Sequence, residues 1–379
     1  MARESERIGL LYPDRDPISA ANWSGTPRGL YSGLTAHGFE VVPIGCDVGL
    51  PVRPVAALLS RSGGRRGVEA HRAPAYVLAR SRALAREFSK AQPLRALLAM
   101  DTDSYDLRRV LGRSLVPTAT YDDGTFALFS RHADSEVRRF GFRLSEVHAW
   151  AARQSVACRR ADVCCVSTTW AAQSVIDDYG LPPSRVRVVG MGHRPRSSSG
   201  QTRDWSVPRF LFVGVDWGRK NGDAVLAAFS AVRQQFPAAT LDLVGGHPPI
   251  DLPGVTGHGL LPREDPTAQR LLDSLFARST VFVLPSRFDP SPIAYLEAAS
   301  AGLPVIATTE GGAGELLGAA ALTVHPDDRP GLEQAMLRLS DPEVARSLGA
   351  EASRLAVESS WEVVAGRILD SLGLVAEPA

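Results

Sequence analysis

The stretch from Val281 to Thr309 constrains the fold of this chain more than any other segment. It begins with an apolar run, 281–284, that predicts a short strand. A helical pattern follows, with Ile293, Leu296 and Ala299 on one face and with Gly302 and Pro304 placed to end the helix. A second apolar run, 305–307, predicts another strand. Strand, helix and strand in this order form a βαβ unit, so we expect a parallel sheet and an α/β protein.

The turn before this helix has the composition of a helix start. Pro285 and Ser286 end the strand. Ser291 is in position to cap the helix, and Pro292 then falls at the first helical position, where its missing N–H costs nothing. Because proline has no N–H, donation to a ligand at this turn is expected from neighbouring amides such as those of Ser291 and Ile293.

Two acidic residues lie within the same unit. Asp289 is in the turn, and Glu297 is in the helix among apolar neighbours, where a carboxylate needs hydrogen-bond donors. In open α/β sheets, ligands bind outside the carboxyl ends of the strands, and a ribose diol can offer two hydroxyl donors to one carboxylate. The alternative is that Glu297 pairs with an arginine and that Asp289 is an ordinary turn residue.

A pair of cations precedes another predicted helix. A strand is expected over 209–213, a turn over 214–218, and a helix from about Asp223 onward. Arg219 and Lys220 therefore lie just ahead of a helix N-terminus, where cations are disfavoured by roughly 0.3–1 kcal/mol each. Their position is explained if they bind a diphosphate together with the free helix N–H groups. Two exposed, solubilising cations are the alternative.

Composition limits the classes of function. A chain of 379 residues that is 44% hydrophobic and 22% charged can form two α/β domains, and its net charge of +1 gives no general attraction to nucleic acid. No apolar run is long enough for a membrane-spanning helix, and the N-terminal residues do not resemble a signal peptide. The four cysteines form no Cys-x-x-Cys pair and are expected to be buried free thiols in a reducing cytoplasm.

The first half of the chain has strands and loops of its own. A strand is expected over 7–12, a loop over 22–27 and a helix over 28–37. The loop lacks the Gly-x-Gly-x-x-Gly pattern of nicotinamide-dinucleotide sites, so such a site is not expected. A simple turn between strand and helix is one interpretation of this loop.

Two further strands of this half are followed by acidic residues. A strand expected over 94–100 leads into Asp101-Thr102-Asp103, and another over 116–121 leads into Asp122 and Asp123. An Asp-x-Asp pair can hold a divalent metal, but two carboxylates alone supply too few ligands, so no metal site is predicted. Asp123 can also be a plain turn residue.

Taken together, these motifs resemble those of a known family. The spacing of Asp289 and Glu297, followed by AGLPVIAT, resembles the Glu-x7-Glu signature of retaining glycosyltransferases with the GT-B fold, specifically glycosyltransferase family 4. The segment FVGVDWGRKNGD resembles that family's diphosphate-binding loop, with Lys220 at the position of its lysine. The chain departs from the family in having Asp for the first glutamate, Pro292 for a glycine and Val215 for an arginine.

Two segments of the first half, WSGTP and DDGTF, are similar to one branch of the same family. The resemblance implies that the first segment approaches the donor phosphates, with Gly25 at the point of closest approach and Thr26 as a hydrogen-bond donor. It also implies that Asp123 faces the sugar-transfer centre, where this carboxylate can orient the acceptor hydroxyl.

The resemblance implies a fold of two Rossmann-like domains facing a cleft, with a last helix that crosses back to the first domain. The predicted segments are 1–195 for the acceptor, a polar linker at 196–206, 207–358 for the nucleotide sugar, and 359–379 for the final helix. The predicted catalytic residues are Asp289, Glu297, Lys220 and Asp123. The predicted donor-binding residues are Gly25, Thr26, Arg219, Lys220, Gly245, Ser286, Asp289, Ser291, Pro292, Ile293 and Glu297. The predicted acceptor-side residues are Trp23, Asp122 and Asp123.

One region, 53–95, is strongly basic. It holds nine arginines and Lys90 against two glutamates, a net charge of 10 − 2 = +8. Each such side chain near an acidic lipid surface contributes about 1 kcal/mol, so the region is consistent with peripheral contact with the inner face of the membrane. A solvated, arginine-rich loop and helix is one alternative, and binding of an acidic acceptor is another.

The sequence therefore predicts a cytoplasmic, retaining glycosyltransferase that needs no metal or other cofactor. It would move a sugar from a nucleotide-diphosphate sugar of unknown base to a hydroxyl of a small polar natural product or of a cell-envelope glycolipid or glycan. One alternative is an epimerase or hydrolase of nucleotide sugars with a similar fold. Another is a catalytically weak homologue that binds a nucleotide sugar or a partner. The sequence carries no signal for the oligomeric state.

Overall fold

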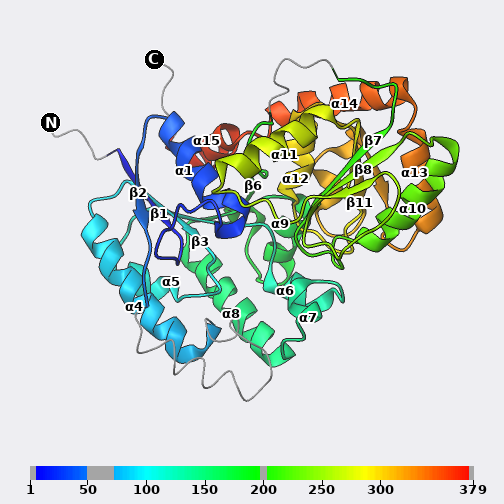
Figure 1. Cartoon of the computed structure of the whole chain (residues 1–379). Coiled ribbons are helices and arrows are strands. Elements are labelled where there is room, and N and C mark those ends of the chain that lie inside the picture. Colours follow the sequence, from blue (N-terminus) through cyan, green and yellow to red (C-terminus); the bar gives the residue numbers. More distant parts are fainter. Residues whose placement is uncertain (1–5, 49–71, 197–202, 375–379) are drawn as a thin grey trace. The chain divides into compact units, whose positions relative to one another are not determined.

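The computed structural model describes residues 6–48, 72–196 and 203–374, which form two α/β units (Figure 1). The first unit contains the described residues of 1–131, together with 137–189 and the chain from Val364 onward. The second unit contains 132–136 and 190–363. The chain thus passes from one unit to the other a few residues before the boundary predicted at 195, and returns a few residues after the one predicted at 358.

Six parallel strands form the sheet of the first unit, in the order β2-β1-β3-β4-β5-β6. The strands are β1 (Arg7–Leu11), β2 (Glu40–Ile44), β3 (Ala96–Met100), β4 (Thr118–Asp122), β5 (Val163–Val166) and β6 (Val186–Val188). Every residue of the inner strands β3 and β5 is buried. Continuous burial of this kind is typical of a parallel sheet that is covered on both faces, as the apolar runs of the sequence predict.

Helices of unequal length connect these strands. They are α1 (Thr26–Ala36), α4 (Pro74–Ala91), α5 (Leu107–Leu111), α6 (Phe126–Arg131), α7 (Glu136–Arg139), α8 (Leu144–Arg160) and α9 (Thr169–Asp177), with short 3-10 helices at Asn22–Gly25 and Pro183–Arg185. Helix α5 lies against both α4 and α8, and α8 also contacts α6. The apolar side chains between these helices and the sheet form the core of the unit.

The final helix, α15 (Trp361–Ser371), returns to the first unit from Val364 onward. The hydroxyl of Ser371 lies 3.4 Å from the Cys165 sulfur on β5. The Arg367 guanidinium donates a 3.2 Å hydrogen bond to the carbonyl of Val189. The last helix therefore packs against the end of a sheet whose strands are far earlier in the sequence, as the family resemblance implies.

The second unit also has a six-stranded parallel sheet, in the order β12-β11-β10-β7-β8-β9. Its strands are β7 (Arg209–Gly214), β8 (Thr240–Gly245), β9 (Val255–Gly257), β10 (Val281–Val283), β11 (Val305–Thr308) and β12 (Ala321–Val324). Its helices are α10 (Gly222–Gln235), α11 (Pro266–Arg278), α12 (Ile293–Ser300), α13 (Arg329–Arg338) and α14 (Pro342–Val357), with 3-10 turns at Ala313–Glu315 and Gly318–Ala320. Helix α10 lies beside α13, and α12 beside α14 (Figure 1). The two pairs enclose one apolar core.

The βαβ unit predicted at 281–309 is confirmed, because β10 and β11 pair in parallel on either side of α12. The predicted start of its helix is wrong by one residue. Pro292 has extended backbone angles and occupies the N-cap position, so α12 begins at Ile293, and no side chain caps it. Ser291, expected to cap this helix, instead has a buried hydroxyl with no hydrogen-bond partner in the described part of the chain. All four cysteines are buried and free, as expected.

Parts of two predicted segments lie outside the described residues, namely 53–71 of the basic region and 197–202 of the linker. The described ends of the linker do not behave as a solvated connection. Arg196 is buried in the second unit, and Arg203 donates to carbonyls at the ends of α11 and α12, including those of Ala277 and Ala301. Among the described residues, no helix is long and apolar enough to span a membrane.

Candidate active site

The predicted donor residues lie at the carboxyl edge of the second sheet, where the strand order reverses. Strands β7 and β10 are neighbours in the sheet, although β8 and β9 separate them in sequence. In such sheets, the two connections that leave adjacent strands at the reversal run to opposite faces and leave a crevice for a ligand. The segment 215–221 follows β7 and the segment 284–292 follows β10, so the charged residues of both meet at this point.

A buried cluster of charge occupies this position. The Lys220 ammonium contacts the Asp289 carboxylate, and both side chains are about nine-tenths buried. The same carboxylate oxygen accepts a 3.1 Å hydrogen bond from Ser286 and lies 3.7 Å from the Arg219 guanidinium. Arg219 also donates to the carbonyl of Phe288 at 3.1 Å. The structure thus brings together four of the predicted donor residues.

The cluster pairs two cations with acids of unequal exposure. Lys220 and Arg219 carry two positive charges, the buried Asp289 carries one negative charge, and the half-buried Asp216 carboxylate lies 4.0 Å from the Arg219 guanidinium. Arg219 also contacts Glu136 at 3.2 Å, but 61% of the Glu136 side chain is exposed, so solvent weakens this pair. Burial lowers the pKa of Lys220, and the nearby Asp289 opposes that change. An incoming anion would stabilise the charged form of the lysine in the same way as Asp289 does.

Two glycines allow the strand-end loops to approach one another here. A Cβ atom at Gly245, which has φ of +126°, would overlap the carbonyl oxygen of Gly214 at the end of β7. A Cβ atom at Gly311, which has φ of +84°, would lie 2.2 Å from the carbonyl oxygen of Asp289. Both positions therefore require glycine, and Gly245 acts in the structure by permitting close packing of two loops.

Glu297 lies on α12 and is 1% exposed. Its Oε1 atom accepts a 3.0 Å hydrogen bond from Arg196 and a 3.2 Å hydrogen bond from Arg263. The structure therefore shows the arginine pairing that the sequence left as an alternative, and the contact with a ribose stays a prediction. Neither arginine was among the residues predicted from the sequence, because one lies in a polar stretch and the other in a loop without a recognisable motif.

The first unit contributes a strained loop after β1. Trp23, Ser24 and Gly25 are three consecutive residues with positive φ, at 39°, 56° and 87°. Helix α1 then begins at Thr26, two residues before the predicted start, and the Thr26 hydroxyl is buried with no partner in the described part of the chain. Left-handed backbone at a non-glycine residue costs on the order of 1–3 kcal/mol, and such conformations cluster at binding sites.

Two predicted acceptor-side residues meet in this unit. The indole N–H of Trp23 donates to the Asp123 carboxylate at 3.3 Å, and the Trp23 ring lies 5.8 Å from that of Tyr121. Burial, followed by the charges of Asp103 and Asp123, raises the pKa of Asp122 well above its usual value. A hydrogen bond thus joins Trp23 to Asp123, and their roles toward a substrate stay predictions.

The Asp101-Thr102-Asp103 segment is explained by an ion pair. Asp103 contacts the Arg72 guanidinium at 2.7 Å, and that guanidinium lies 4.8 Å from the centre of the Trp150 ring. Asp101 has φ of +53°, and burial, assisted by Asp103, raises the pKa of its carboxyl group to about 7. Within the described residues, no group of three His, Cys, Asp or Glu side chains is arranged to hold a metal ion.

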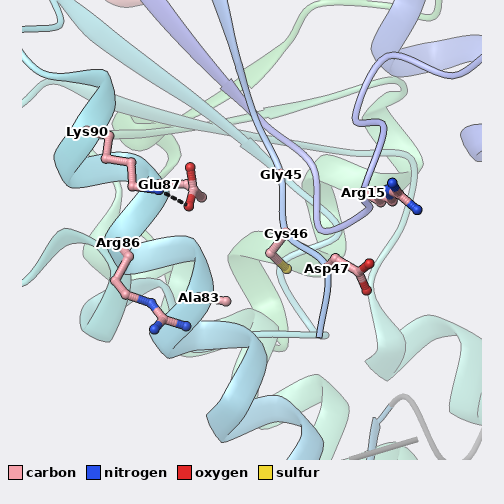
Figure 2. Close-up of a pocket in the computed structure, with 8 residues that line it drawn as sticks. All are labelled: Arg15, Gly45, Cys46, Asp47, Ala83, Arg86, Glu87 and Lys90. Atoms are coloured by element: carbon pink, nitrogen blue, oxygen red, sulfur yellow. Dashed lines mark hydrogen bonds and ion pairs between the residues drawn. The ribbon is translucent and has the colours of Figure 1, made fainter. Parts of the chain in front are cut away.

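A separate cavity of about 380 Å³ lies in the first unit between α4 and the segment that follows β2 (Figure 2). Its lining includes Arg15, Asp47, Arg86, Glu87 and Lys90. The last two form an exposed ion pair at 2.8 Å, which Figure 2 shows as a dashed line. None of the predicted site residues lines this cavity. Two basic side chains of the predicted basic region, Arg86 and Lys90, do line it.

Comparison with known proteins identifies most of the second unit. Residues 207–341 match the family model described as "Glycosyl transferases group 1". These residues are therefore similar to the group 1 domain of glycosyl transferases. The matched segment runs from just before β7 to the residue before α14, so it includes Lys220, Asp289 and Glu297. It includes neither Arg196 nor any residue of the first unit, so the family match does not extend to Trp23.

Curated relatives of this chain include proteins named as a glycogen synthase and as a glycosyltransferase. The chain is 32% identical to the glycogen synthase of Mycobacterium tuberculosis over 165 residues, which are 41% of this chain and 40% of that protein. It is 28% identical to the D-inositol 3-phosphate glycosyltransferase of Rhodococcus opacus over 229 residues, covering 54% of this chain and 51% of that protein. The matched part thus spans about half or less of the length of these relatives.

The fold extends beyond the group 1 domain to nearly the whole chain. An Escherichia coli structure described as "Trehalose-6-phosphate from E. coli bound with UDP-2-fluoro glucose" superimposes with a TM-score of 0.69, covering 98% of this chain and 99% of that one. Sequence identity is 12%, so this likeness concerns the fold alone. The predicted α/β architecture, with two parallel sheets of the GT-B type, is confirmed.

Proposed function

We propose that this chain is a retaining glycosyltransferase that moves a sugar from a nucleotide-diphosphate sugar to a hydroxyl acceptor. The observation that carries the proposal is the cluster of Arg219, Lys220 and Asp289 at the strand-order reversal of the second unit. Its two cations lie just ahead of α10, whose N-terminus has no side-chain cap. Such a position suits a diphosphate. The group 1 match, and the nucleotide sugar in the E. coli structure, support the same assignment.

Each charged residue has a role in the proposed reaction. The bond between the sugar carbon and the diphosphate oxygen breaks, and negative charge grows on the departing diphosphate. Lys220 and Arg219 stabilise that charge at fixed positions, and their ammonium and guanidinium groups need little rearrangement. When the donor binds, its diphosphate replaces Asp289 as the main partner of Lys220. The Asp289 carboxylate then contacts the transferred sugar. Glu297 accepts hydrogen bonds from the ribose.

Two orphaned hydroxyl groups fit an oxygen-rich ligand. Thr26 in the first unit and Ser291 in the second are 0% and 5% exposed, and neither hydroxyl has a hydrogen-bond partner in the described part of the chain. Buried polar atoms are nearly always paired, so an unpaired one suggests a missing ligand or water. Both residues belong to the predicted donor set, and Ser291 immediately precedes the N-cap residue of α12.

The acceptor part of the proposal concerns Trp23, Asp122 and Asp123. The acceptor hydroxyl forms the new bond to the sugar carbon and gives up its proton to an oxygen of the departing diphosphate, and Asp123 orients that hydroxyl. The acceptor is a small polar natural product or a cell-envelope glycolipid or glycan, and retention of configuration follows from the family resemblance. No metal or cofactor is part of the proposal, because Lys220, Arg219 and the α10 N-terminus supply the positive charge. The cytoplasmic location and the contact with the membrane through 53–95 stay predictions.

Titration calorimetry with ADP, GDP and UDP, without added metal, tests the donor site. We expect one of them to bind wild type, and Lys220→Met to weaken that binding at least ten-fold because a charged hydrogen bond contributes about 1.5–3 kcal/mol. The chain has only one other lysine, Lys90, which is exposed and paired with Glu87. Lys90→Met is therefore a matched control and should bind like wild type.

The product separates the proposed function from its alternatives. Incubation of wild type with the corresponding nucleotide sugar and a panel of hydroxyl acceptors should release nucleoside diphosphate only when an acceptor is present. Release without any acceptor would indicate a hydrolase, and a changed sugar on an intact nucleotide would indicate an epimerase. No binding of any of the three nucleotides would contradict the donor site itself.

A further inference from the structure

Arg196 has the largest fully buried side chain of the described residues, although it lies in the connection between β6 and β7. None of the side chain is exposed to solvent. A buried guanidinium is costly unless several partners share its charge and its hydrogen bonds. A residue that only connects two sheets would not need a buried guanidinium, so the partners of Arg196 should show its role.

The partners of Arg196 come from α11 and α12. One terminal nitrogen donates to Glu297 Oε1 at 3.0 Å, and the other donates to Asp273 Oδ1 at 2.7 Å. The second nitrogen also lies 3.3 Å from the side-chain oxygen of Gln269, and the guanidinium is 5.2 Å from the centre of the Phe276 ring. The planar group is thus held by a carboxylate on each side and by an aromatic ring over its face.

The backbone of the same residue is also attached to α12. The Arg196 amide donates to the hydroxyl of Ser300 at 3.0 Å, and that hydroxyl in turn donates to the carbonyl of Glu297. The arginine therefore contacts the helix that carries Glu297 at two points. Its own donor groups face Glu297, Asp273 and Gln269, so it has no group left to offer a ligand except a buried Nε without a partner.

The effect of these contacts is to fix one oxygen of Glu297 and leave the other available. Both Arg196 and Arg263 donate to Oε1, and no hydrogen bond to Oε2 occurs within the described residues. Arg263 is 30% exposed, whereas Arg196 is fully buried, so Arg196 is the more rigid of the two partners. A carboxylate held through one oxygen presents the second in a defined direction.

We propose that Arg196 is a positioning residue that orients the Glu297 carboxylate so that Oε2 accepts hydrogen bonds from the ribose diol of the donor. This inference rests on the proposed function, since it requires that Glu297 binds the ribose. Arg196 does not touch the nucleotide. It sets the direction of the carboxylate that does.

The test compares nucleotides that have the diol with nucleotides that lack it. Calorimetry with ADP, GDP and UDP identifies the nucleotide that wild type binds, and its 2′,3′-dideoxy counterpart is then measured in the same way. We expect wild type to bind the dideoxy nucleotide roughly ten-fold or more weakly, because hydrogen bonds to a carboxylate are lost. In Arg196→Met, binding of the complete nucleotide should weaken and this ratio should fall toward one.

A conservative variant and a matched control accompany this measurement. Arg196→Lys keeps a positive charge but cannot reach Glu297 and Asp273 together, so it should show an intermediate ratio and provides the answer if Arg196→Met does not fold. Arg203 is in the same connection and donates only to backbone carbonyls, including those of Phe276 and Gly302. Arg203→Met should therefore keep the wild-type ratio even if its melting temperature falls.

The outcomes distinguish this inference from the function on which it rests. If wild type binds none of the nucleotides, the proposed function fails first. If wild type discriminates against the dideoxy nucleotide and both Arg196 variants keep the same ratio, the proposed function stands and the positioning role is wrong. An equal loss of affinity for both nucleotides would show that the arginine supports the fold of the site without orienting Glu297.

Discussion

The two candidate regions differ in how completely their carboxylates are paired with cations. In the second unit, each buried acid has a cation beside it, with Asp289 next to Lys220 and Glu297 next to two arginines. In the first unit, Asp103 has Arg72 beside it, but burial and neighbouring acids raise the pKa of the nearby Asp101 to about 7 and that of Asp122 well above its usual value. Pairing keeps a carboxylate charged, whereas burial near other acids favours its protonated form. The donor region is thus suited to ionic ligands, and the proposed acceptor region can offer O–H donors to neutral hydroxyls.

The largest expected effect is that of Glu297→Gln, which removes a charge from the paired region. Loss of one partner from a buried ion pair typically costs about 3–5 kcal/mol. Because Asp273 still contacts Arg196, we expect the free energy of unfolding to fall by about 3 kcal/mol, measured by urea denaturation. Glu351→Gln on α14 is the control, since Glu351 forms no ion pair among the described residues. Equal stability of wild type and Glu297→Gln would show that the pairing contributes little.

Asp101→Asn tests the unpaired region through pH. The folded protein keeps the Asp101 proton up to about pH 7, whereas the unfolded chain releases it near the usual value of 3.8. The free energy of unfolding of wild type should therefore decrease as the pH rises from 3.8 to about 7. The decrease is at most about 1.4 kcal/mol for each unit by which the folded and unfolded pKa values differ.

Asp101→Asn has no carboxyl group to titrate at this position, and asparagine tolerates the left-handed backbone of residue 101. Its stability relative to wild type should rise from pH 5 to pH 8, by roughly 1–3 kcal/mol in denaturant titrations. Asp47→Asn replaces an exposed acid of the same unit and controls for the loss of a charge. A stability difference that is the same at pH 5 and pH 8 would rule out a raised pKa at Asp101.

A smaller effect is expected at the orphaned hydroxyls, one of which lies in each unit. Thr26→Val and Ser291→Ala each remove a buried hydroxyl that has no partner, so the free energy of unfolding should stay the same or rise by about 1 kcal/mol. Affinity for the nucleoside diphosphate should fall in the same variants. Thermal denaturation with and without the nucleotide measures both quantities. A stability loss in the absence of nucleotide would mean that these hydroxyls already have partners.

The smallest expected effect is that of Trp23→Phe. The ring remains beside Tyr121, and only the hydrogen bond from the indole N–H to Asp123 is lost. The stability change should be about 1 kcal/mol or less. If Asp123 orients the acceptor, the KM for the acceptor should increase while the affinity for the nucleotide is unchanged. Steady-state kinetics at saturating donor measures this KM. If Trp23→Phe changed only the affinity for the nucleotide, Trp23 would belong to the donor site and not to the acceptor site.

Local sequence patterns predict the strands and helices well because they report burial. The apolar runs at 209–213 and 281–284 are strands in the structure to within one residue at each end. The sequence predicts that the cations at 219 and 220 lie just before a helix N-terminus, and α10 begins at Gly222. The βαβ order predicts a parallel sheet, and ligands of such sheets bind at the carboxyl ends of the strands. These two rules are enough to predict that the two loops of the candidate site lie at one edge of the sheet.

The partners of the charged residues were not predictable in the same way. Arg196 lies next to a serine- and glycine-rich stretch that is typical of a solvated linker, yet it is buried against Glu297. Nothing in the neighbouring residues indicates which helix would receive its side chain. The pairing of Lys220 with Asp289 likewise depends on the neighbouring positions of β7 and β10 in the sheet. Ion pairs across a sheet edge are set by tertiary structure, and a single sequence does not encode them locally.

The path of the chain has a consequence for synthesis on the ribosome. The second unit is made of almost continuous sequence, 190–363, and the first unit needs the helix segment from Val364 onward. Residues such as Arg367 and Ser371, which contact Val189 and Cys165, leave the ribosome only after the whole second unit has been made. Domains usually fold in the order of their translation. In this chain, the unit that begins first is therefore the one completed last, and the surface that receives α15 stays uncovered during translation of the other unit.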